Sequence, residues 1–141
     1  MPLATQLIIS LENKPGALSR VASALGSAGV NIKAFHAPET SGGGRASTGK
    51  LRIIVTELDR ARVALKAHKL RFREESALVL SLENKPGALQ DVAELLKAAR
   101  INITCGYCTP SREGKRAIVV LTVSNHKKAL EALRGKSLDE F

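Results

Sequence analysis

The nine residues Ser10-Leu11-Glu12-Asn13-Lys14-Pro15-Gly16-Ala17-Leu18 recur letter for letter as Ser81 to Leu89. The number of residues between the two copies also separates Asn31-Ile32 from Asn102-Ile103. This repeat spacing is about half of the 141-residue chain, which indicates a tandem duplication. The sequence therefore predicts one structural unit that is built twice.

In the first half, the residues before the repeated stretch predict a strand and those from Pro15 onward predict a helix. Leu7, Ile9 and Leu11 alternate along the strand and give it one strongly apolar face. Proline is favoured at the first position of a helix, and Gly29 marks the end of this one. The remaining expected elements are strands at 30–34, 51–55 and 70–76, and a second helix that a capping box at 56–59 opens and that ends near residue 67.

The order β-α-β-β-α-β predicts an α+β, ferredoxin-like fold, in which one antiparallel sheet carries two helices on one face. We expect two such units, at residues 1–76 and 77–141, the second with a helix over 125–133 and a short or absent last strand. The opposite face of each sheet is apolar as well, because it carries Ile8, Phe35 and Ile54 in one half and Val79, Ile118 and Val120 in the other. Such a face has to be covered, which predicts face-to-face packing within the chain or in a homodimer.

The chain is strongly basic, with 22 Lys and Arg against 13 Asp and Glu and a net charge of +9. This charge is compatible with nucleic acid, an acidic partner or a small anion. Aromatic residues make up only 3% of the chain and tryptophan is absent, which argues against a surface on which bases stack. The cations gather in and after the second predicted helix, a pattern typical of a solvated face: Arg60, Arg62, Lys66, Lys69, Arg71 and Arg73.

No apolar run approaches the ~20 residues that cross a membrane, and residues 1–6 lack the features of a signal peptide. We therefore expect a cytoplasmic protein without a membrane partner.

The repeated turn has the chemistry of an anion site. A helix that opens at Pro15 leaves the backbone N–H groups of Gly16, Ala17 and Leu18 free at the positive end of the helix dipole. A carboxylate or phosphate is the natural occupant, and Asn13 and Asn31 offer further donors and acceptors. The same residues also suit a purely structural strand-to-helix turn with asparagine caps.

Glu-Asn-Lys-Pro-Gly-Ala-Leu, followed by Gly-Val-Asn-Ile at 29–32, resembles the signature of the ACT domain, a small ferredoxin-like regulatory module that binds amino acids. The resemblance covers nearly the whole chain twice and is closest to stand-alone tandem ACT-domain proteins. It implies that the ligand lies where two ACT domains meet, between the Pro-Gly turn of one and the asparagine after the helix of the other. The neighbour belongs either to the same chain or to a second one.

The resemblance implies two equivalent ligand sites. One combines Asn13, Pro15, Gly16, Ala17 and Leu18 with Asn102, and the other combines Asn84, Pro86, Gly87, Ala88 and Leu89 with Asn31. Serine-binding members of the family carry a histidine two residues before the motif asparagine, where this chain has Leu11 and Leu82. That departure favours a ligand with a more apolar side chain.

Other motifs predict no further chemistry. Residues 44–50 match the start of a P-loop, but Leu51 stands where the magnesium-binding Ser or Thr belongs and a strand follows, so we interpret 40–49 as a hairpin loop. Cys105 and Cys108 fall in a strand with side chains on opposite faces, which favours packing over metal or redox chemistry. His36 could border a ligand pocket. No set of side chains forms a catalytic constellation, and we expect neither a cofactor nor a metal.

The leading hypothesis is a non-enzymatic regulatory protein that binds an L-amino acid and passes the signal to a partner enzyme or regulator. One alternative is the small regulatory subunit of a biosynthetic enzyme of the acetohydroxyacid synthase type. The other is a basic nucleic-acid-binding protein, because the RNA-recognition motif shares this topology but uses aromatic residues that the expected strands lack.

Overall fold

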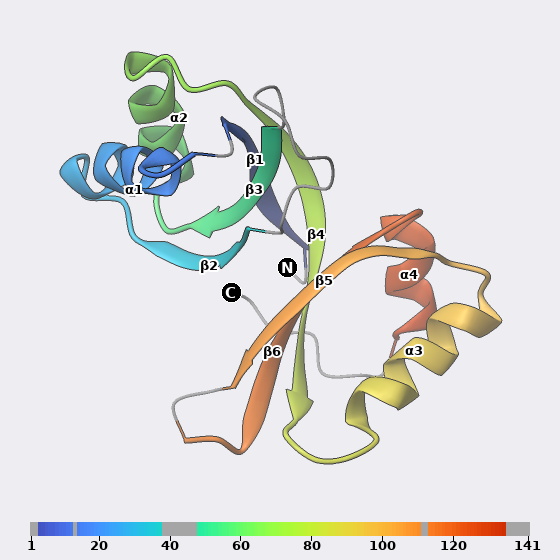
Figure 1. The fold of residues 1–141 in the computed structure, drawn as a ribbon. Helices are drawn as coiled ribbons and strands as arrows, with labels where there is room; N and C mark the ends of the chain where they lie inside the picture. Colours follow the sequence, from blue (N-terminus) through green and yellow to red (C-terminus); the bar gives the residue numbers. More distant parts are fainter. Residues whose placement is uncertain (1–2, 13, 38–47, 111–112, 135–141) are drawn as a thin grey trace. The chain divides into compact units, whose positions relative to one another are not determined.

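The computed structural model describes residues 3–12, 14–37, 48–110 and 113–134 (Figure 1). The chain divides into two compact units, which we call the N-terminal unit (Thr5–Glu75) and the C-terminal unit (Ser76–Phe141 with Met1–Ala4). Three expectations fall outside the described residues: the role of Asn13, most of the hairpin loop at 40–49, and a last strand at 135–141.

The N-terminal unit follows the predicted order of elements. Its strands are arranged β2-β3-β1-β4, and β3 is antiparallel to both β1 and β2. This is the strand order of the ferredoxin-like fold, so the predicted fold class is confirmed. The elements are β1 (Leu3–Glu12), α1 (Ala17–Ser27), β2 (Ile32–His36), β3 (Thr48–Val55), α2 (Leu58–Ala67) and the beginning of β4 (Phe72–Glu83).

The core of the N-terminal unit lies between its strands and its two helices, which cover one face of the sheet (Figure 1). Leu7 pairs with Ile53 across β1 and β3, and Ile9 pairs with Leu51. All four side chains are fully or almost fully buried, together with Leu25 of α1 and other apolar residues of both helices. The alternation of apolar residues that predicted β1 therefore selects the face on which the helices pack.

Phe35 does not lie on the sheet face that we predicted. It pairs with Ile53, a core residue, so its side chain points to the helix-covered face of the sheet and not to the opposite one. The cause is a shift of register between Ile32 and Ala34, which moves the later residues of β2 to the other face. Phe35 is nevertheless 57% exposed, because β2 is at the edge of the sheet.

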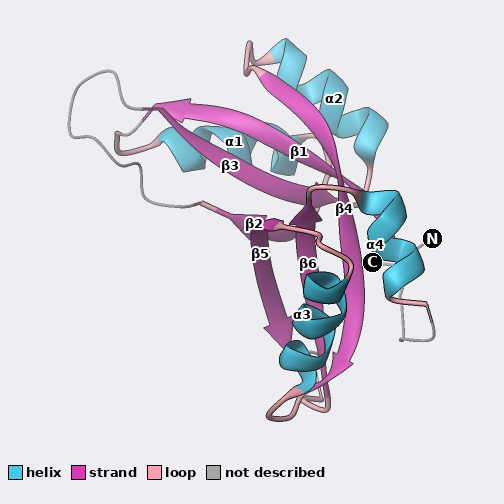
Figure 2. Cartoon of the chain, turned by 90° about the vertical axis from the view of Figure 1, so that its right-hand side faces the viewer, coloured by secondary structure: helices cyan, strands magenta, loops and turns pink. Residues whose placement is uncertain are grey.

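The C-terminal unit repeats this architecture with strands in the order β4-β6-β5, all antiparallel (Figure 2). Leu78 and Leu80 of β4, Leu96 of α3 and Leu133 after α4 are almost completely buried in its core. Its own elements are α3 (Ala88–Ala98), β5 (Ile103–Pro110), β6 (Arg116–Val123) and α4 (His126–Ala132).

Two strands contribute residues to both units. The predicted strand at 70–76 and the first strand of the second repeat form one continuous strand, β4, of 12 residues. Leu3, at the beginning of β1, packs against the core of the C-terminal unit, and β1 is the hydrogen-bonded neighbour of β4. The beginning of β1 thus takes the position beside β4 where the ferredoxin-like order has its last strand.

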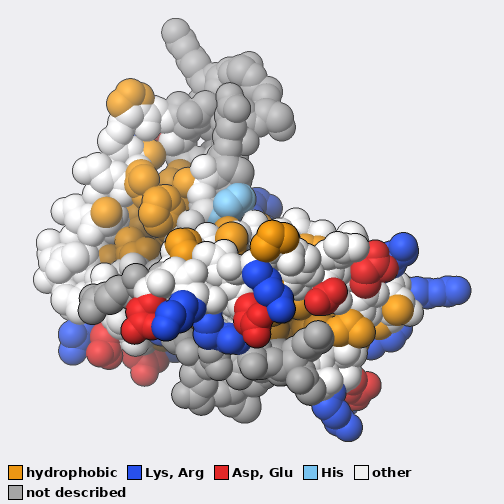
Figure 3. Space-filling view, turned by 90° about the horizontal axis from the view of Figure 1, so that it is seen from below, with side chains coloured by type: hydrophobic (Ala, Val, Ile, Leu, Met, Phe, Trp, Pro, Cys, Tyr) orange, Lys and Arg blue, Asp and Glu red, His pale blue; other side chains and the backbone are white. Residues whose placement is uncertain are grey.

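Large apolar side chains are exposed in both units. Figure 3 shows a face on which apolar side chains gather beside charged ones. Across both units, the large apolar side chains that are exposed in the described ranges are Leu18, Phe35, Val63, Leu89, Leu95 and Ile103. Within the described ranges, no helix is long and apolar enough to cross a membrane.

Candidate ligand site

The repeated Pro-Gly motif forms a type II turn in each unit. Gly16 has φ 90° and ψ −10°, and the N–H of Ala17 donates to the carbonyl oxygen of Lys14 at 3.3 Å. Gly87 repeats this conformation with φ 89° and ψ −13°, and Ala88 donates to Lys85 at 3.4 Å. The expectation that proline opens the helix is therefore wrong. The helices begin two residues later, at Ala17 and Ala88, because a glycine with positive φ cannot continue a right-handed helix.

The first turns of α1 and α3 present backbone N–H groups that could bind an anion. Gly16 and Gly87 are the N-caps, and neither helix receives a side-chain capping hydrogen bond within the described residues. A Cβ atom added to either glycine would meet no atom within 4 Å, so the space beside the turn is open. The N–H of Ala17 is used within the turn, which leaves the amides of the following residues, Leu18 in α1 and Leu89 in α3, at the positive helix end.

Asn84 is held firmly beside its turn. Its side-chain nitrogen donates to the carbonyl oxygen of Gly114 at 2.9 Å, and its backbone N–H donates to Lys115 at 2.9 Å. Both acceptors belong to the connection between β5 and β6. One of the two N–H donors of the amide is therefore engaged by the protein, and its oxygen can accept a hydrogen bond from a ligand.

Asn31 and Asn102 are exposed and lie after α1 and α3, in equivalent hydrogen-bond patterns. The N–H of Asn31 donates to Oγ1 of Thr56 at 3.1 Å, and that of Asn102 donates to Oγ of Ser124 at 3.0 Å. Thr56 was expected to cap α2, but the N-cap is Glu57 and no side chain caps it in the described part of the chain. The Thr56 hydroxyl instead fixes the start of β2.

A single unit does not bring the two parts of the predicted site together. The Pro-Gly turn precedes α1 and Asn31 follows it, so the 11 residues of the helix, about 16 Å of axial rise, separate them. The same holds for Gly87 and Asn102 around α3. The combination of a turn from one unit with an asparagine from another stays a prediction.

The C-terminal unit contains an apolar pocket of about 470 Å³ next to its Pro-Gly turn. It lies between the first half of α3 and the edge strand β5, and residues of β6 line it as well. Of the predicted site residues, Asn84, Ala88 and Leu89 reach it. Its apolar lining consists mainly of Leu82, Ala88, Leu89, Ala93, Ile103, Ala117, Val119 and Leu121.

Sequence reasoning missed this pocket, although the alignment of the two repeats contains a signal. Gly106 lines the pocket, and the repeat spacing aligns it with Phe35. The side chain of Leu121 leans over Gly106, so that a Cβ atom there would come within 2.9 Å of it. Tyr107, which aligns with His36, also lines the pocket, whereas His36 itself lies in β2, half-buried.

Each turn is flanked by a short-range ion pair. Lys14 Nζ lies 2.8 Å from Glu12, and Lys85 Nζ lies 2.7 Å from Glu83. The hydrogen bond from Lys85 lowers the pKa of Glu83, and the same bond raises the pKa of Lys85. Lys14 lowers the pKa of Glu12 in the same way. Both carboxylates are exposed and remain charged near neutral pH.

The two cysteines lie in β5, as expected. Cys105 pairs with Thr122 and Cys108 pairs with Val119, positions on opposite faces of the sheet. Cys105 is half-buried, whereas Cys108 is exposed and lines the apolar pocket. In the described part of the chain, no three His, Cys, Asp or Glu side chains are grouped so that they could hold a metal ion.

Comparison with known proteins agrees with this architecture. The family model of an ACT domain pair matches residues 3–141, and no catalytic family is indicated. Protein BT0572 from Bacteroides thetaiotaomicron is 34% identical, with a TM-score of 0.85 over 94% of this chain and 88% of that one. No match was found among the curated proteins.

Two further structures share the fold at lower identity. The regulatory subunit of aspartate kinase from Thermus thermophilus is 16% identical, with a TM-score of 0.64 over 96% of this chain and 92% of that one. Aspartate kinase from Synechocystis is also 16% identical, with a TM-score of 0.61 over 99% of this chain but only 27% of that one.

Proposed function

Because the chain belongs to the family of ACT domain pairs, we propose that it is a non-catalytic regulatory protein that binds a free L-amino acid. The observation that carries the proposal is the position of the apolar pocket beside the Pro-Gly turn of the C-terminal unit. A free apolar α-amino acid needs both features, because its carboxylate and ammonium groups are charged and its side chain is apolar.

The turn provides for the carboxylate. The uncapped first turn of α3 presents backbone N–H groups at the positive end of the helix, with open space beside Gly87. Lys85 and Glu83, which form an ion pair, both lie at the rim of the pocket. A carboxylate placed here would accept hydrogen bonds from these backbone N–H groups, which receive no side-chain cap within the described residues.

The pocket provides for an apolar side chain. Its lining is mainly aliphatic, and Leu82 stands where serine-binding relatives resembling this sequence have a histidine. An aliphatic or aromatic side chain gains about 0.8 kcal/mol for each CH₂ group that leaves water. We therefore propose leucine, isoleucine, valine or phenylalanine as the ligand class, and not serine.

The asparagines provide for the ammonium group. The free oxygen of Asn84 is an acceptor next to the turn, and we propose that Asn31 from an ACT unit contributes a second one. We propose an equivalent second site, formed by Asn13, Pro15, Gly16, Ala17 and Leu18 with Asn102.

We further propose that the protein is a cytoplasmic homodimer that acts on a partner enzyme or regulator. The exposed Leu89 and Ile103 are candidate contact residues.

A thermal-shift screen of the twenty L-amino acids, followed by calorimetric titration of the strongest, tests the proposal. A ligand at 100 times its dissociation constant adds about 2.7 kcal/mol to the free energy of unfolding. Ala93→Met puts a longer side chain into the pocket and is expected to weaken binding at least tenfold. Ala98→Met, at the exposed end of the same helix, is the matched control. Equal affinity for apolar and charged amino acids, or no shift with any of the twenty, would contradict the proposal.

A further inference from the structure

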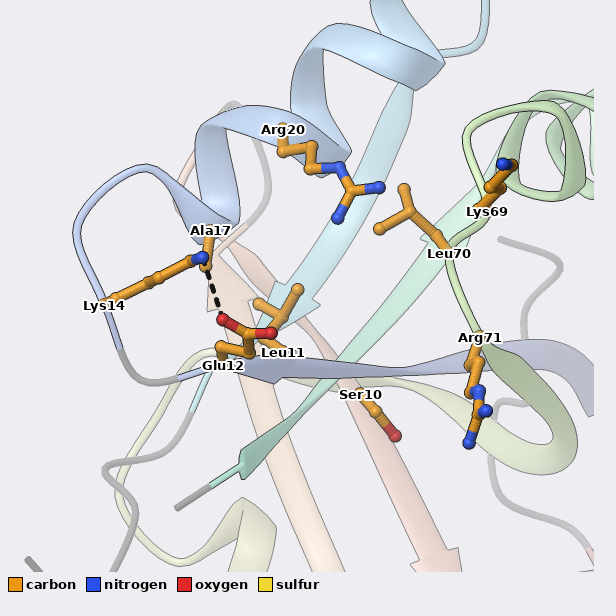
Figure 4. A pocket seen from close by; sticks show the side chains of 9 residues that line it. All are labelled: Ser10, Leu11, Glu12, Lys14, Ala17, Arg20, Lys69, Leu70 and Arg71. Carbon is orange, nitrogen blue, oxygen red and sulfur yellow. Dashed lines mark ion pairs between the residues drawn. The ribbon is translucent and has the colours of Figure 1, made fainter. Parts of the chain in front are cut away.

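The N-terminal unit contains a cleft that is separate from the apolar pocket of the C-terminal unit and that shares one residue, Ala17, with the proposed second amino-acid site. It has a volume of about 470 Å³ and lies between the first half of α1, the end of β1 and the segment that joins α2 to β4. Four of its lining residues are cationic, Lys14, Arg20, Lys69 and Arg71, and one is acidic, Glu12. Figure 4 shows these side chains around the cleft.

Within the described part of the chain, Lys14 is the one cation of the four that forms an ion pair with an acidic side chain. Lys14 forms the ion pair with Glu12, drawn as a dashed line in Figure 4. Arg20 donates from one guanidinium nitrogen to the carbonyl oxygen of His68 at 2.7 Å, which ties it to the end of α2 and leaves its other donors available. Among the described residues, no acidic side chain pairs with Lys69 or Arg71. The cleft therefore carries a surplus of positive charge.

The duplication provides an internal reference for this surplus. The equivalent cleft of the C-terminal unit, about 220 Å³, is lined by identical residues at five positions: Ser81, Leu82, Glu83, Lys85 and Ala88. The position of Arg20 is taken there by Asp91. A second cation, Arg116, bonds to Ser81 from its Nε at 2.6 Å. Among the described residues, two acidic and two basic side chains line this cleft, so it lacks the excess of positive charge found in the N-terminal cleft.

We propose that the cleft of the N-terminal unit binds a small phosphate monoester with an aliphatic body. A phosphate monoester carries a charge of about −1.5 to −2 near neutral pH and matches the surplus better than a single carboxylate does. Arginine binds phosphate through paired N–H donors, and the bond to His68 positions Arg20 for this role. The cleft has the size of a small-molecule site.

The lining also restricts the rest of the ligand. Leu11, Ala17 and Leu70 are the apolar residues of the cleft, and no aromatic ring lines it. A base or other flat aromatic group would find no stacking partner there. In Figure 4, the side chains of Lys69 and Arg71 point in different directions from the segment that contains Leu70. This arrangement suits a short, flexible body that ends in a phosphate.

Calorimetric titration of the full chain with glycerol 3-phosphate, in phosphate-free buffer at constant ionic strength, tests the proposal. Glycerol and sodium chloride are the uncharged and simple-salt controls, and inorganic phosphate shows how much of the affinity comes from the phosphate group. We expect saturable binding of glycerol 3-phosphate, weaker binding of inorganic phosphate and none of glycerol.

Charge variants locate the binding. Arg20→Asp installs the residue of the other unit and is expected to weaken binding at least tenfold. Lys127→Asp makes the same change of net charge in the first turn of α4, where an acidic residue suits the helix, and is expected to leave affinity unchanged. Lys69→Asn removes a charge at a position with φ 56°, which asparagine tolerates well, so it should fold and still weaken binding several-fold.

Three results would overturn the proposal. Wild type that does not bind glycerol 3-phosphate is one, and equal affinity in Arg20→Asp and Lys127→Asp is another. The third is an RNA oligonucleotide whose binding depends on Arg20 and Lys69 while glycerol 3-phosphate stays unbound, since it would assign the cleft to nucleic acid. The amino-acid titration with Ala93→Met is a separate measurement, so failure of one proposal leaves the other standing.

Discussion

The side-chain nitrogen of Asn84 lies 2.9 Å from the carbonyl oxygen of Gly114, so the residue before the second Pro-Gly turn is anchored to the connection between β5 and β6. The bond links the mouth of the apolar pocket to a segment 30 residues further along the chain. A ligand that forms a hydrogen bond with Asn84 is therefore linked, through this residue, to the connection between β5 and β6 as well as to the turn.

Asn84→Asp removes the donor from this bond while it preserves the size of the side chain. A carboxylate cannot donate to Gly114 and faces a carbonyl oxygen, so we expect a loss of about 1 kcal/mol of stability in urea unfolding. We also expect at least tenfold weaker amino-acid binding by calorimetry. Unchanged affinity would show that ligand binding does not depend on the bond between Asn84 and Gly114.

Gly16→Ala and Gly87→Ala each force an alanine into the left-handed region, at φ 90° and φ 89°. We expect each to destabilise the protein by about 1–2 kcal/mol in chemical unfolding. Gly26→Ala is the matched control, because Gly26 lies within α1 with open space around it and alanine there is expected to stabilise by about 0.5–1 kcal/mol. A loss of stability in Gly26→Ala as large as in the other two would contradict the backbone explanation.

Leu3→Ala removes an apolar side chain from the core of the C-terminal unit, although residue 3 is near the beginning of the chain. We expect a loss of about 1 kcal/mol and faster amide hydrogen exchange in β6. Val63→Ala, at a side chain that is 69% exposed, should change stability by less than about 0.5 kcal/mol. Exchange in β6 that matches wild type would refute a role for Leu3 in this unit.

The Glu83–Lys85 pair gives a pH dependence whose sign can be worked out. Lys85 lowers the pKa of Glu83 below its ordinary value of 4.5, so the folded protein binds this proton less readily than the unfolded chain. The stabilisation is present above pH 4.5 and is lost as the pH falls through the lowered pKa of the folded state. In carboxyl NMR titrations, Lys85→Met is expected to return the Glu83 midpoint toward 4.5, and a midpoint that does not move would contradict this pairing.

The sequence predicted the fold because local and repeated signals agreed. The alternation of Leu7 and Ile9 and the helical spacing around Leu25 both select the buried face that the structure shows. The Pro-Gly motif was harder, since proline suits both the first position of a helix and the second position of a type II turn, and only the φ of Gly16 distinguishes them.

The apolar pocket of the C-terminal unit and the cationic cleft of the N-terminal unit could not be predicted, because each depends on contacts between residues that are far apart in the chain. Lys69 and Arg71 were interpreted as part of a solvated face, and only the fold brings them to the same cleft as Arg20. The apolar pocket depends on Gly106 and on the side chain of Leu121 that leans over it, a relationship that no local pattern encodes. The register shift in β2 that redirects Phe35 is likewise absent from simple alternation.

The unbroken strand β4, from Phe72 to Glu83, has a consequence for evolution and engineering. Tandem duplications commonly leave parts that can be shuffled, deleted or fused to new partners one at a time. Here the junction between the copies lies inside a strand, and Leu3 of the first copy serves the core of the second. Cutting the gene at this junction would divide β4 and separate Leu3 from the core that it packs against, so the two copies have to be transferred together in engineering.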